Sequence, residues 1–155
     1  MLTIRALPEP AGPEQFRFSA SFPIHYDHID AQRHLNNVAY FLFMQQARLA
    51  YLREIGLWDG VSFDSVGMIL LETGCIFHMP ALYGETVTVW TRVSRLGTKS
   101  FDFEYRLVTE KGDVATGRSV QVCYDYDGQR SVPMPAAWRN AIESFEPALR
   151  GAPSP

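Results

Sequence analysis

Five stretches of the chain have the alternation and composition of β-strands with one buried face. In the first stretch, Phe16, Phe18 and Ala20 alternate with polar residues, and Pro23 marks an end or an edge because it lacks a backbone donor. The predicted strands cover residues 15–24, 67–78, 85–95, 98–109 and 114–126. These strands are enough to form one antiparallel sheet.

A long apolar run between the first and second strands predicts a helix over residues 38–55, because it contains no Gly or Pro. Asn36 fits the N-cap of this helix and Gly56 fits its C-terminal end. In the first half, over residues 40–44, apolar side chains lie on every side. We therefore expect the helix to be enclosed on nearly all of its faces.

The predicted order is strand, long helix, four strands and a short helix over residues 136–145, which is an α+β fold class. A curled antiparallel sheet wrapped around the long helix would bury a helix that is apolar all round. Short connections such as the turn at 111–113 favour antiparallel neighbours. We expect one domain over 15–146, with flexible segments at 1–14 and 147–155 that are rich in Pro and Gly.

Composition excludes several classes of protein. The 155 residues are 46% hydrophobic and 20% charged, as in a globular chain with a core. A net charge of −3 disfavours a broad nucleic-acid-binding face. No apolar run approaches the roughly 20 residues of a membrane span, and the N-terminus lacks the pattern of a secretory signal.

The two cysteines, Cys75 and Cys123, are too few for a disulfide framework. Their apolar strand neighbours predict buried free thiols, which point to a reducing cytoplasm. No His, Cys and Asp residues have the spacing of a zinc or iron site, so we expect no metal. The sequence predicts a cytoplasmic protein with neither nucleic acid nor membrane as a partner.

The strongest candidate for chemistry is the polar stretch 26–37, which combines carboxylates, imidazoles and carboxamides directly before the long helix. A helix N-terminus presents unpaired N–H groups and a partial positive charge that can polarise a carbonyl or hold an oxyanion. Asp30, in the loop before Asn37, could attack the same carbonyl or activate water. On spacing alone, an Asx turn at Asp30 and a plain N-cap at Asn36 are alternatives.

The segment Asp-Ala-Gln-Arg-His-Leu-Asn-Asn-Val-Ala-Tyr over residues 30–40 is followed by Gln-Gln-Ala-Arg over 45–48. The two resemble the Asp-x-x-Gly-His-Val-Asn-Asn-x-x-Tyr and Glu-Glu-Ala-Arg signature of hotdog-fold acyl-CoA thioesterases of the 4-hydroxybenzoyl-CoA thioesterase type. The similarity extends over about residues 15–146. It implies a hydrolase that cleaves an acyl-CoA to free acid and CoA, without any cofactor besides the CoA of the substrate.

The resemblance assigns Asp30 to the position of the catalytic carboxylate, as general base or nucleophile. It assigns Asn37 to the helix start, where the backbone N–H polarises the thioester carbonyl. His34 and Asn36 fall on the His and the first Asn of the signature, where we expect them to hold the loop on the helix. His34 is also a candidate for handling protons.

Three residues depart from the family pattern. Arg33 replaces a Gly at a turn that often takes positive φ, and His28 stands where many relatives carry Asp. Gln45 replaces a helix Glu and cannot act as a general base. Asp30 is then the only well-placed carboxylate, and an acyl-CoA-binding protein without catalysis is one alternative.

CoA phosphates require cations, and an acyl group requires an apolar slot. The predicted phosphate contacts are Arg92, Arg95 and Lys99. The predicted acyl contacts are Tyr40, Met44 and Met68. The resemblance also implies a homodimer or homotetramer, which agrees with the need to pair an open sheet edge. A thioesterase acting on acyl carrier protein is a second alternative.

Overall fold

The computed structural model describes residues 12–63 and 66–151. Most of the expected flexible segments, residues 1–11 and 152–155, lies outside the described residues, and the domain boundaries stay predictions. The helices and strands are β1 (Phe18–Pro23), α1 (Asn37–Glu54), β2 (Val66–Phe77), β3 (Thr86–Leu96), β4 (Ser100–Thr109), β5 (Gly112–Asp125), β6 (Arg130–Ser131) and α2 (Ala136–Phe145). Short 3-10 helices cover Pro13–Gln15, Tyr26–His28 and Pro147–Leu149.

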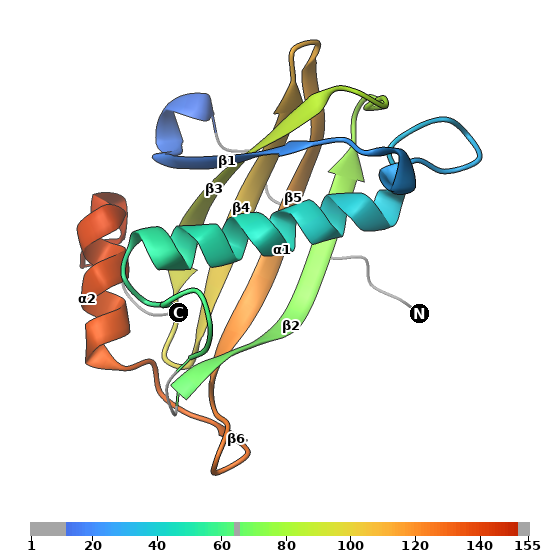
Figure 1. Cartoon of the computed structure of the whole chain (residues 1–155). Helices are drawn as coiled ribbons and strands as arrows, with labels where there is room; N and C mark the ends of the chain where they lie inside the picture. The colour runs from blue at the N-terminus through green and yellow to red at the C-terminus, as the bar shows by residue number, and fades with distance from the viewer. Residues whose placement is uncertain (1–11, 64–65, 152–155) are drawn as a thin grey trace, which may run out of the picture.

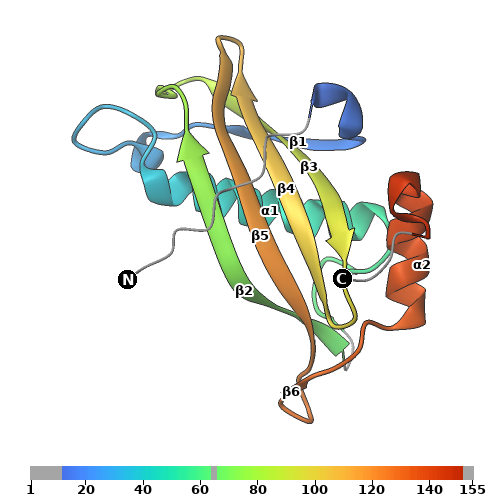
Figure 2. The ribbon, with the colours of Figure 1, turned by 180° about the vertical axis from the view of Figure 1, so that it is seen from behind.

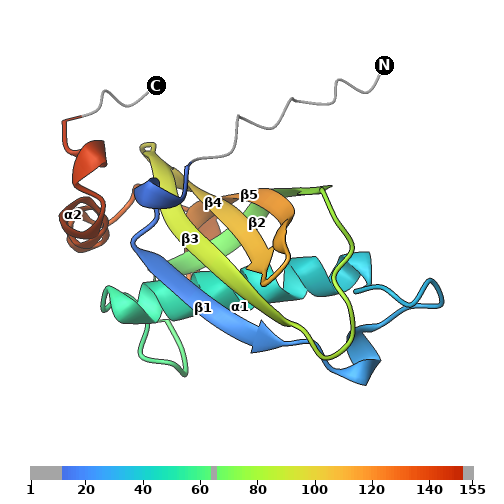
Figure 3. The same ribbon diagram turned by 90° about the horizontal axis from the view of Figure 1, so that it is seen from above.

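The strands form one antiparallel sheet in the order β1-β3-β4-β5-β2, with the short β6 paired to β5. The sheet curls around α1, which lies along its concave side (Figures 1 and 3). The view from behind shows the opposite face of β2, β5, β4 and β3, with α2 beside the C-terminal end of α1 (Figure 2). This arrangement confirms the predicted α+β hotdog fold.

The strand order differs from the sequence order at β2, because the chain crosses from β2 at one edge of the sheet to β3 near the other. β3, β4 and β5 follow one another as hairpins, but β2 pairs with β5 at the end of the sheet. Because β2 and β1 are the two outer strands, the described part of the chain leaves one side of each without a neighbour. The sequence predicted the strands but not β6, whose two residues carry no pattern of their own.

Both ends of α1 are as the sequence predicted. The side-chain oxygen of Asn36 accepts a hydrogen bond from the backbone N–H of Val38 at 2.9 Å. After the helix, Gly56 has φ of 77°, a left-handed conformation in which glycine is favoured. These two residues fix where the helix starts and stops.

The core is a cluster of large side chains between α1 and the concave face of the sheet. The fully buried members with the largest side chains include Phe43, Met44, Tyr51, Leu52, Phe101, Phe103, Tyr105 and Leu107. Cys123 is also buried, whereas Cys75 on β2 is only half-buried. No helix in the described part of the chain is long and apolar enough to cross a bilayer.

The expectation that α1 is enclosed on nearly all faces is wrong for one stripe. Val38 is 66% exposed and Leu42 is 38% exposed, and Gln45 on the same side is also exposed. α1 packs more closely on β1 and β3 than on β2, so the described residues leave this side of the helix uncovered. Apolar residues at these positions therefore need a different explanation from core packing.

The loop before α1 is held by backbone hydrogen bonds. The N–H of Asp30 donates to the carbonyl of His34 and the N–H of Arg33 donates to the carbonyl of Asp30, each at 3.0 Å. Ile29 and Leu35 form an isolated antiparallel bridge, which closes the loop at its base. Arg33 has φ of 65°, so the bulky residue occupies the left-handed turn that the sequence indicated.

The far end of α1 is anchored by a buried carboxyl. The hydroxyl of Tyr51 donates to Oε1 of Glu146 at 2.9 Å, and the backbone N–H of Val93 donates to the same oxygen at 3.4 Å. Burial raises the pKa of Glu146 above its usual value of 4.5, although these donors and nearby arginines oppose the shift. Burial and the neighbouring carboxyl also raise the pKa of Tyr51.

Replacing Glu146 by Gln should change how stability depends on pH. Because the raised pKa means that folded protein holds the proton more tightly than unfolded protein, the carboxyl favours folding below pH 4.5. This contribution is lost as the pH rises toward the folded-state pKa. Urea unfolding at several pH values should show E146Q gaining stability relative to wild type as the pH rises, because the neutral amide still accepts from Tyr51.

E146A supplies the control. It lacks the same titrating carboxyl as E146Q, but loss of the acceptor leaves the buried Tyr51 hydroxyl unpaired, so E146A should be about 1–3 kcal/mol less stable than E146Q at every pH. A gap between wild type and E146Q that does not vary with pH would contradict the assignment of Glu146 as the titrating group.

Replacing Arg33 by Gly should stabilise the protein by up to about 1 kcal/mol, because glycine adopts positive φ without a Cβ clash. Arg33→Ala is the matched control, since alanine removes the same long side chain but keeps the clash. The free energy of unfolding from urea titration measures both. Finding R33G no more stable than R33A would mean that the turn is not strained.

Candidate active site

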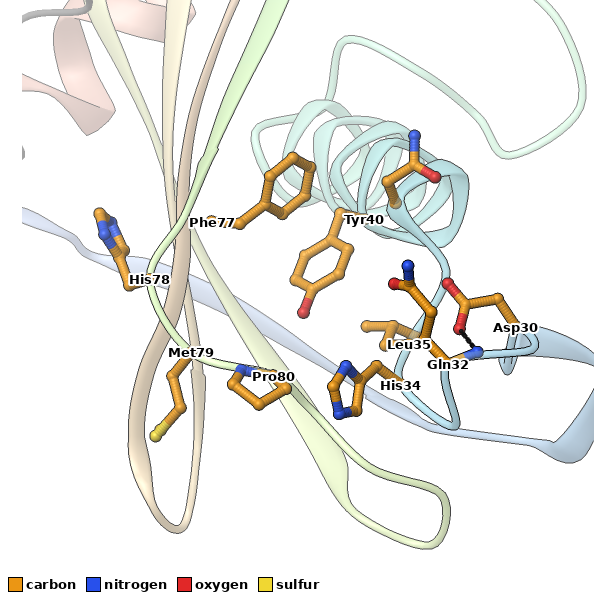
Figure 4. A pocket seen from close by; sticks show the side chains of 10 residues that line it. Asp30, Gln32, His34, Leu35, Tyr40, Phe77, His78, Met79 and Pro80 are labelled. Carbon is orange, nitrogen blue, oxygen red and sulfur yellow. Dashed lines mark hydrogen bonds between the residues drawn. The ribbon is translucent and has the colours of Figure 1, made fainter.

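A pocket of about 400 Å³ lies at the N-terminal end of α1 (Figure 4). Its lining comes from the loop before the helix, from the first turn of the helix, and from the end of β2 with the segment that follows it. The lining residues are Asp30, Gln32, His34, Leu35, Asn37, Tyr40, Phe77, His78, Met79 and Pro80.

The loop is fixed against the rest of the protein on both sides. The N–H of Leu35 donates to the carbonyl of Ala81, and the N–H of Asn36 donates to the carbonyl of His28, each at 2.8 Å. The first bond attaches the loop to the segment after β2, and the second attaches the start of the helix to the segment after β1. The loop therefore reaches the pocket in one defined position.

Asp30 is half-buried and lines the pocket. Its Oδ1 accepts a hydrogen bond from the backbone N–H of Gln32 at 2.8 Å, which is the Asx turn considered from the sequence (Figure 4). The turn uses one carboxylate oxygen, and no hydrogen bond to the second oxygen occurs among the described residues. The structural and chemical interpretations of Asp30 are therefore compatible.

Asn37 is the first residue of α1 and lines the same pocket. At this position the backbone N–H has no acceptor within the helix. The aligned peptide dipoles also give this end of α1 a partial positive charge, which no acidic residue in the first turn offsets. The pocket thus combines a carboxylate with the positive end of an 18-residue helix.

The opposite wall of the pocket is apolar. The rings of Tyr40 and Phe77 meet edge to face with 5.0 Å between their centroids. Burial raises the pKa of Tyr40, so this phenol stays protonated at neutral pH. Pro80 and Leu35 lie below these rings (Figure 4). Such a wall suits an apolar group attached to a reactive carbonyl.

Of the two histidines that line the pocket, His34 belongs to the loop and is exposed. Its backbone carbonyl accepts from the N–H of Asp30, and the role of its side chain stays a prediction. The ring of His78 contacts Oγ1 of Thr116 at 3.0 Å and points away from Tyr40 (Figure 4). His78 is thus engaged with a strand rather than aimed at Asp30.

The cations predicted for CoA lie elsewhere in the single chain. Arg92 pairs with Glu104 at 2.7 Å, and Arg95 pairs with Asp102 at 2.7 Å. Lys99 is exposed beside Ser131. No Arg or Lys of the described residues lines the pocket of Asp30. The three cations stay predictions, and CoA phosphates would have to reach them by extending out of this pocket.

Of the three residues predicted to contact the acyl group, one lines the pocket of Asp30 and two lie elsewhere. Tyr40 lines the pocket, whereas Met44 is buried deeper along α1 and Met68 is half-buried on β2. Gln45 lies on the exposed stripe of α1 and lines a different cavity. The sequence did not single out Phe77, Met79 and Pro80 as one wall of the site, since only folding brings the end of β2 beside the start of α1.

Neither cysteine is suited to nucleophilic catalysis. Burial raises the pKa of Cys75 to about 12 and that of Cys123 to about 11. Both thiols are therefore protonated at neutral pH, and the thiolate is the nucleophilic form. Asp30 is the carboxylate that lines the pocket, and its catalytic role stays a prediction.

Comparison with known proteins places the chain in a family. Residues 24–142 match the Thioesterase-like superfamily. The long-chain acyl-CoA thioesterase FadM of Escherichia coli K12 is 21% identical over 120 residues, which cover 76% of this chain and 91% of FadM. The match contains the loop, α1 and the strands that line the pocket.

Solved structures support the same relationship. The PA2801 protein of Pseudomonas aeruginosa is 30% identical with a TM-score of 0.74, over 83% of this chain and 99% of that one. A thioesterase-superfamily protein from Jannaschia sp. CCS1 has the same fold, with 24% identity and a TM-score of 0.80 over 90% of this chain and 89% of that one. Sequence and fold agree, and the chain belongs to the Thioesterase-like superfamily.

Proposed function

We propose that this thioesterase hydrolyses acyl-CoA, with Asp30 as the general base and the N-terminus of α1 as the group that polarises the thioester carbonyl. The observation that carries the proposal is that Asp30 and Asn37 line one pocket, so that a carboxylate and the positive end of a helix meet there. The apolar wall of Tyr40 and Phe77 would receive the acyl group.

The chemistry follows from these two groups. The thioester oxygen accepts from the N–H of Asn37, and the carboxylate of Asp30 takes a proton from water as the water oxygen attacks the carbonyl carbon. The tetrahedral intermediate then breaks its C–S bond, and the proton held by Asp30 passes to the departing CoA thiolate. Oxygen of water ends in the free acid, and Asp30 returns to its ionised form.

CoA is the proposed carrier of the acyl group because FadM, which matches over most of both chains, is named as an acyl-CoA thioesterase. Two alternatives make different predictions. An acyl-carrier-protein thioesterase would cleave the carrier thioester faster than the CoA thioester. A non-catalytic binding protein, which the replacement of a helix Glu by Gln45 would favour, would bind acyl-CoA without releasing thiol.

Replacing Asp30 by Asn should lower kcat for acyl-CoA hydrolysis by about 10²–10⁴-fold, because the amide cannot take a proton from water but can still accept from Gln32. Release of CoA can be followed with a thiol reagent across short, long and aryl acyl-CoA esters. Asp27→Asn is the matched control, since Asp27 is an exposed acid in the neighbouring 3-10 helix. Equal loss in both variants, or full activity of D30N, would refute the assignment.

We also propose that two copies associate through β2. This strand of 12 residues pairs with β5 on one side only, within the described residues, and carries exposed apolar side chains. Ile69, Leu70, Leu71, Ile76 and Phe77 are all between 40% and 68% exposed. A second copy related by a two-fold axis would pair β2 with β2 and cover the open stripe of α1. Assembly of such dimers into a tetramer stays a prediction.

Replacing Leu71 by Lys should shift the protein from dimer to monomer, because a charge would be placed on the apolar edge. The molar mass from light scattering after size exclusion measures the shift over a dilution series. Tyr26→Lys is the control, since Tyr26 is 80% exposed but lies on the side of β1. A wild-type protein that is monomeric at every concentration would contradict the proposed association.

A further inference from the structure

Arg48 is a cation buried inside the protein, with only 7% of its surface exposed. It projects from α1 toward the concave face of the sheet. Its Nη1 donates to the hydroxyl of Tyr105 at 3.0 Å and to Oγ of Ser119 at 3.4 Å. These two hydroxyls lie 2.7 Å apart, and Nε2 of Gln121 donates to Oγ of Ser119 at 3.1 Å. All of these partners are neutral.

The charge of Arg48 therefore has no counter-ion in the described part of the chain. Its Nε is buried and has no hydrogen-bond partner among these residues. Its Nη2 also makes no hydrogen bond to these residues, but it is not buried to the same degree. Arg118, which is 8% exposed, is different because it pairs with Asp102 at 2.8 Å. Buried charges are normally paired. Arg48 therefore has room for one more hydrogen-bond acceptor, which a bound molecule could supply.

A second cavity of about 260 Å³ borders Arg48 between α1 and β2. Its walls are Val38, Phe41, Leu42, Met44, Gln45, Arg48, Leu70 and Thr73. Most of these walls are apolar, and Arg48 is the charged residue among them. The cavity thus resembles an apolar slot with a cationic end.

This cavity and the pocket of Asp30 are both lined by residues of α1 and β2. Tyr40 and Phe77 border the first pocket, and Met44 and Thr73, each four residues away on the same element, border the second. With a rise of about 1.5 Å per residue, Arg48 lies roughly 16 Å along α1 from Asn37. An acyl chain of medium to long length would extend from the reacting carbonyl to Arg48.

We propose that this cavity receives the distal end of the acyl group and that Arg48 binds an oxygen acceptor there. A carboxylate fits best, since it accepts a charge-assisted hydrogen bond from the free Nη2 and neutralises the buried charge. The preferred substrates are then acyl thioesters oxidised at the end remote from sulfur. This inference rests on the proposed thioesterase function and names the acyl class that the site selects.

The test compares dodecanoyl-CoA, ω-hydroxydodecanoyl-CoA and the CoA monothioester of dodecanedioic acid. Wild type should show kcat/KM about tenfold higher for the carboxylate-ended ester than for the methyl-ended ester, with the hydroxyl-ended ester between them. Arg48→Met should abolish this preference, and Arg48→Lys should keep part of it. Arg53→Met is the matched control, since Arg53 is exposed on the same helix and lies outside the cavity.

Binding of the same three esters to D30N, measured by calorimetry, separates this inference from the proposed function. Hydrolysis without any preference for an oxygenated end would overturn the role of Arg48 and leave the thioesterase proposal standing. If wild type binds the oxygenated esters preferentially but hydrolyses none of them, the role of Arg48 stands and the thioesterase proposal is overturned.

Wild-type preference decides the matter even if variants of Arg48 fail to fold, since equal kcat/KM and equal affinity for the three esters refute the proposal. Thermal unfolding and molar mass of each variant complete the test. An R48M protein that folds, loses dimerisation and keeps its substrate ratios would mean that a second copy supplies the missing acceptor, which also overturns the proposal.

Discussion

Burial of one side of α1 in a curled sheet is the constraint on which the rest of the structure depends. The helix brings Phe43, Met44 and Tyr51 into the core against the concave face of the sheet. Because the helix is long and lies across the concave side, its two ends reach opposite rims of the sheet (Figure 1). One end is anchored by Glu146, and the other carries the candidate active site.

The active-site end of α1 is polar because the backbone N–H groups of the first turn have no acceptors within the helix. The first N–H groups of any helix lack partners within the helix, and here Asn36 accepts from one of them while Asn37 faces the pocket. The loop of Asp30 is closed on itself and tied to Ala81. Folding energy thus holds a carboxylate beside a positive helix end before any substrate arrives.

The other side of α1 has the opposite property, since it is left incomplete. Val38 and Leu42 are exposed apolar residues, and Arg48 is a buried cation without a counter-ion among the described residues. The edge of β2 alongside also lacks a neighbouring strand there. Exposed apolar surface, an open edge and an unpaired charge are each unfavourable alone. All three lie on the side of the molecule where we propose a second copy and the distal end of the acyl group.

The sequence by itself determined the elements and brought out the candidate residues at the start of α1. Strand alternation, the absence of Gly and Pro over 38–55 and the capping residue Asn36 are local signals, so they predicted the strands and both helix ends. The positive φ of Arg33 was also indicated, because a family pattern with Gly marks a backbone requirement.

Only the tertiary structure decided which surfaces meet. Periodicity showed that α1 is apolar all round, but not that β2 stays farther from it than β1 and β3 and leaves a stripe open. The Phe77 wall of the pocket and the isolation of Arg48 come from contacts between distant segments. A local pattern specifies which faces of an element are apolar, whereas strand order and curvature decide what lies against each face.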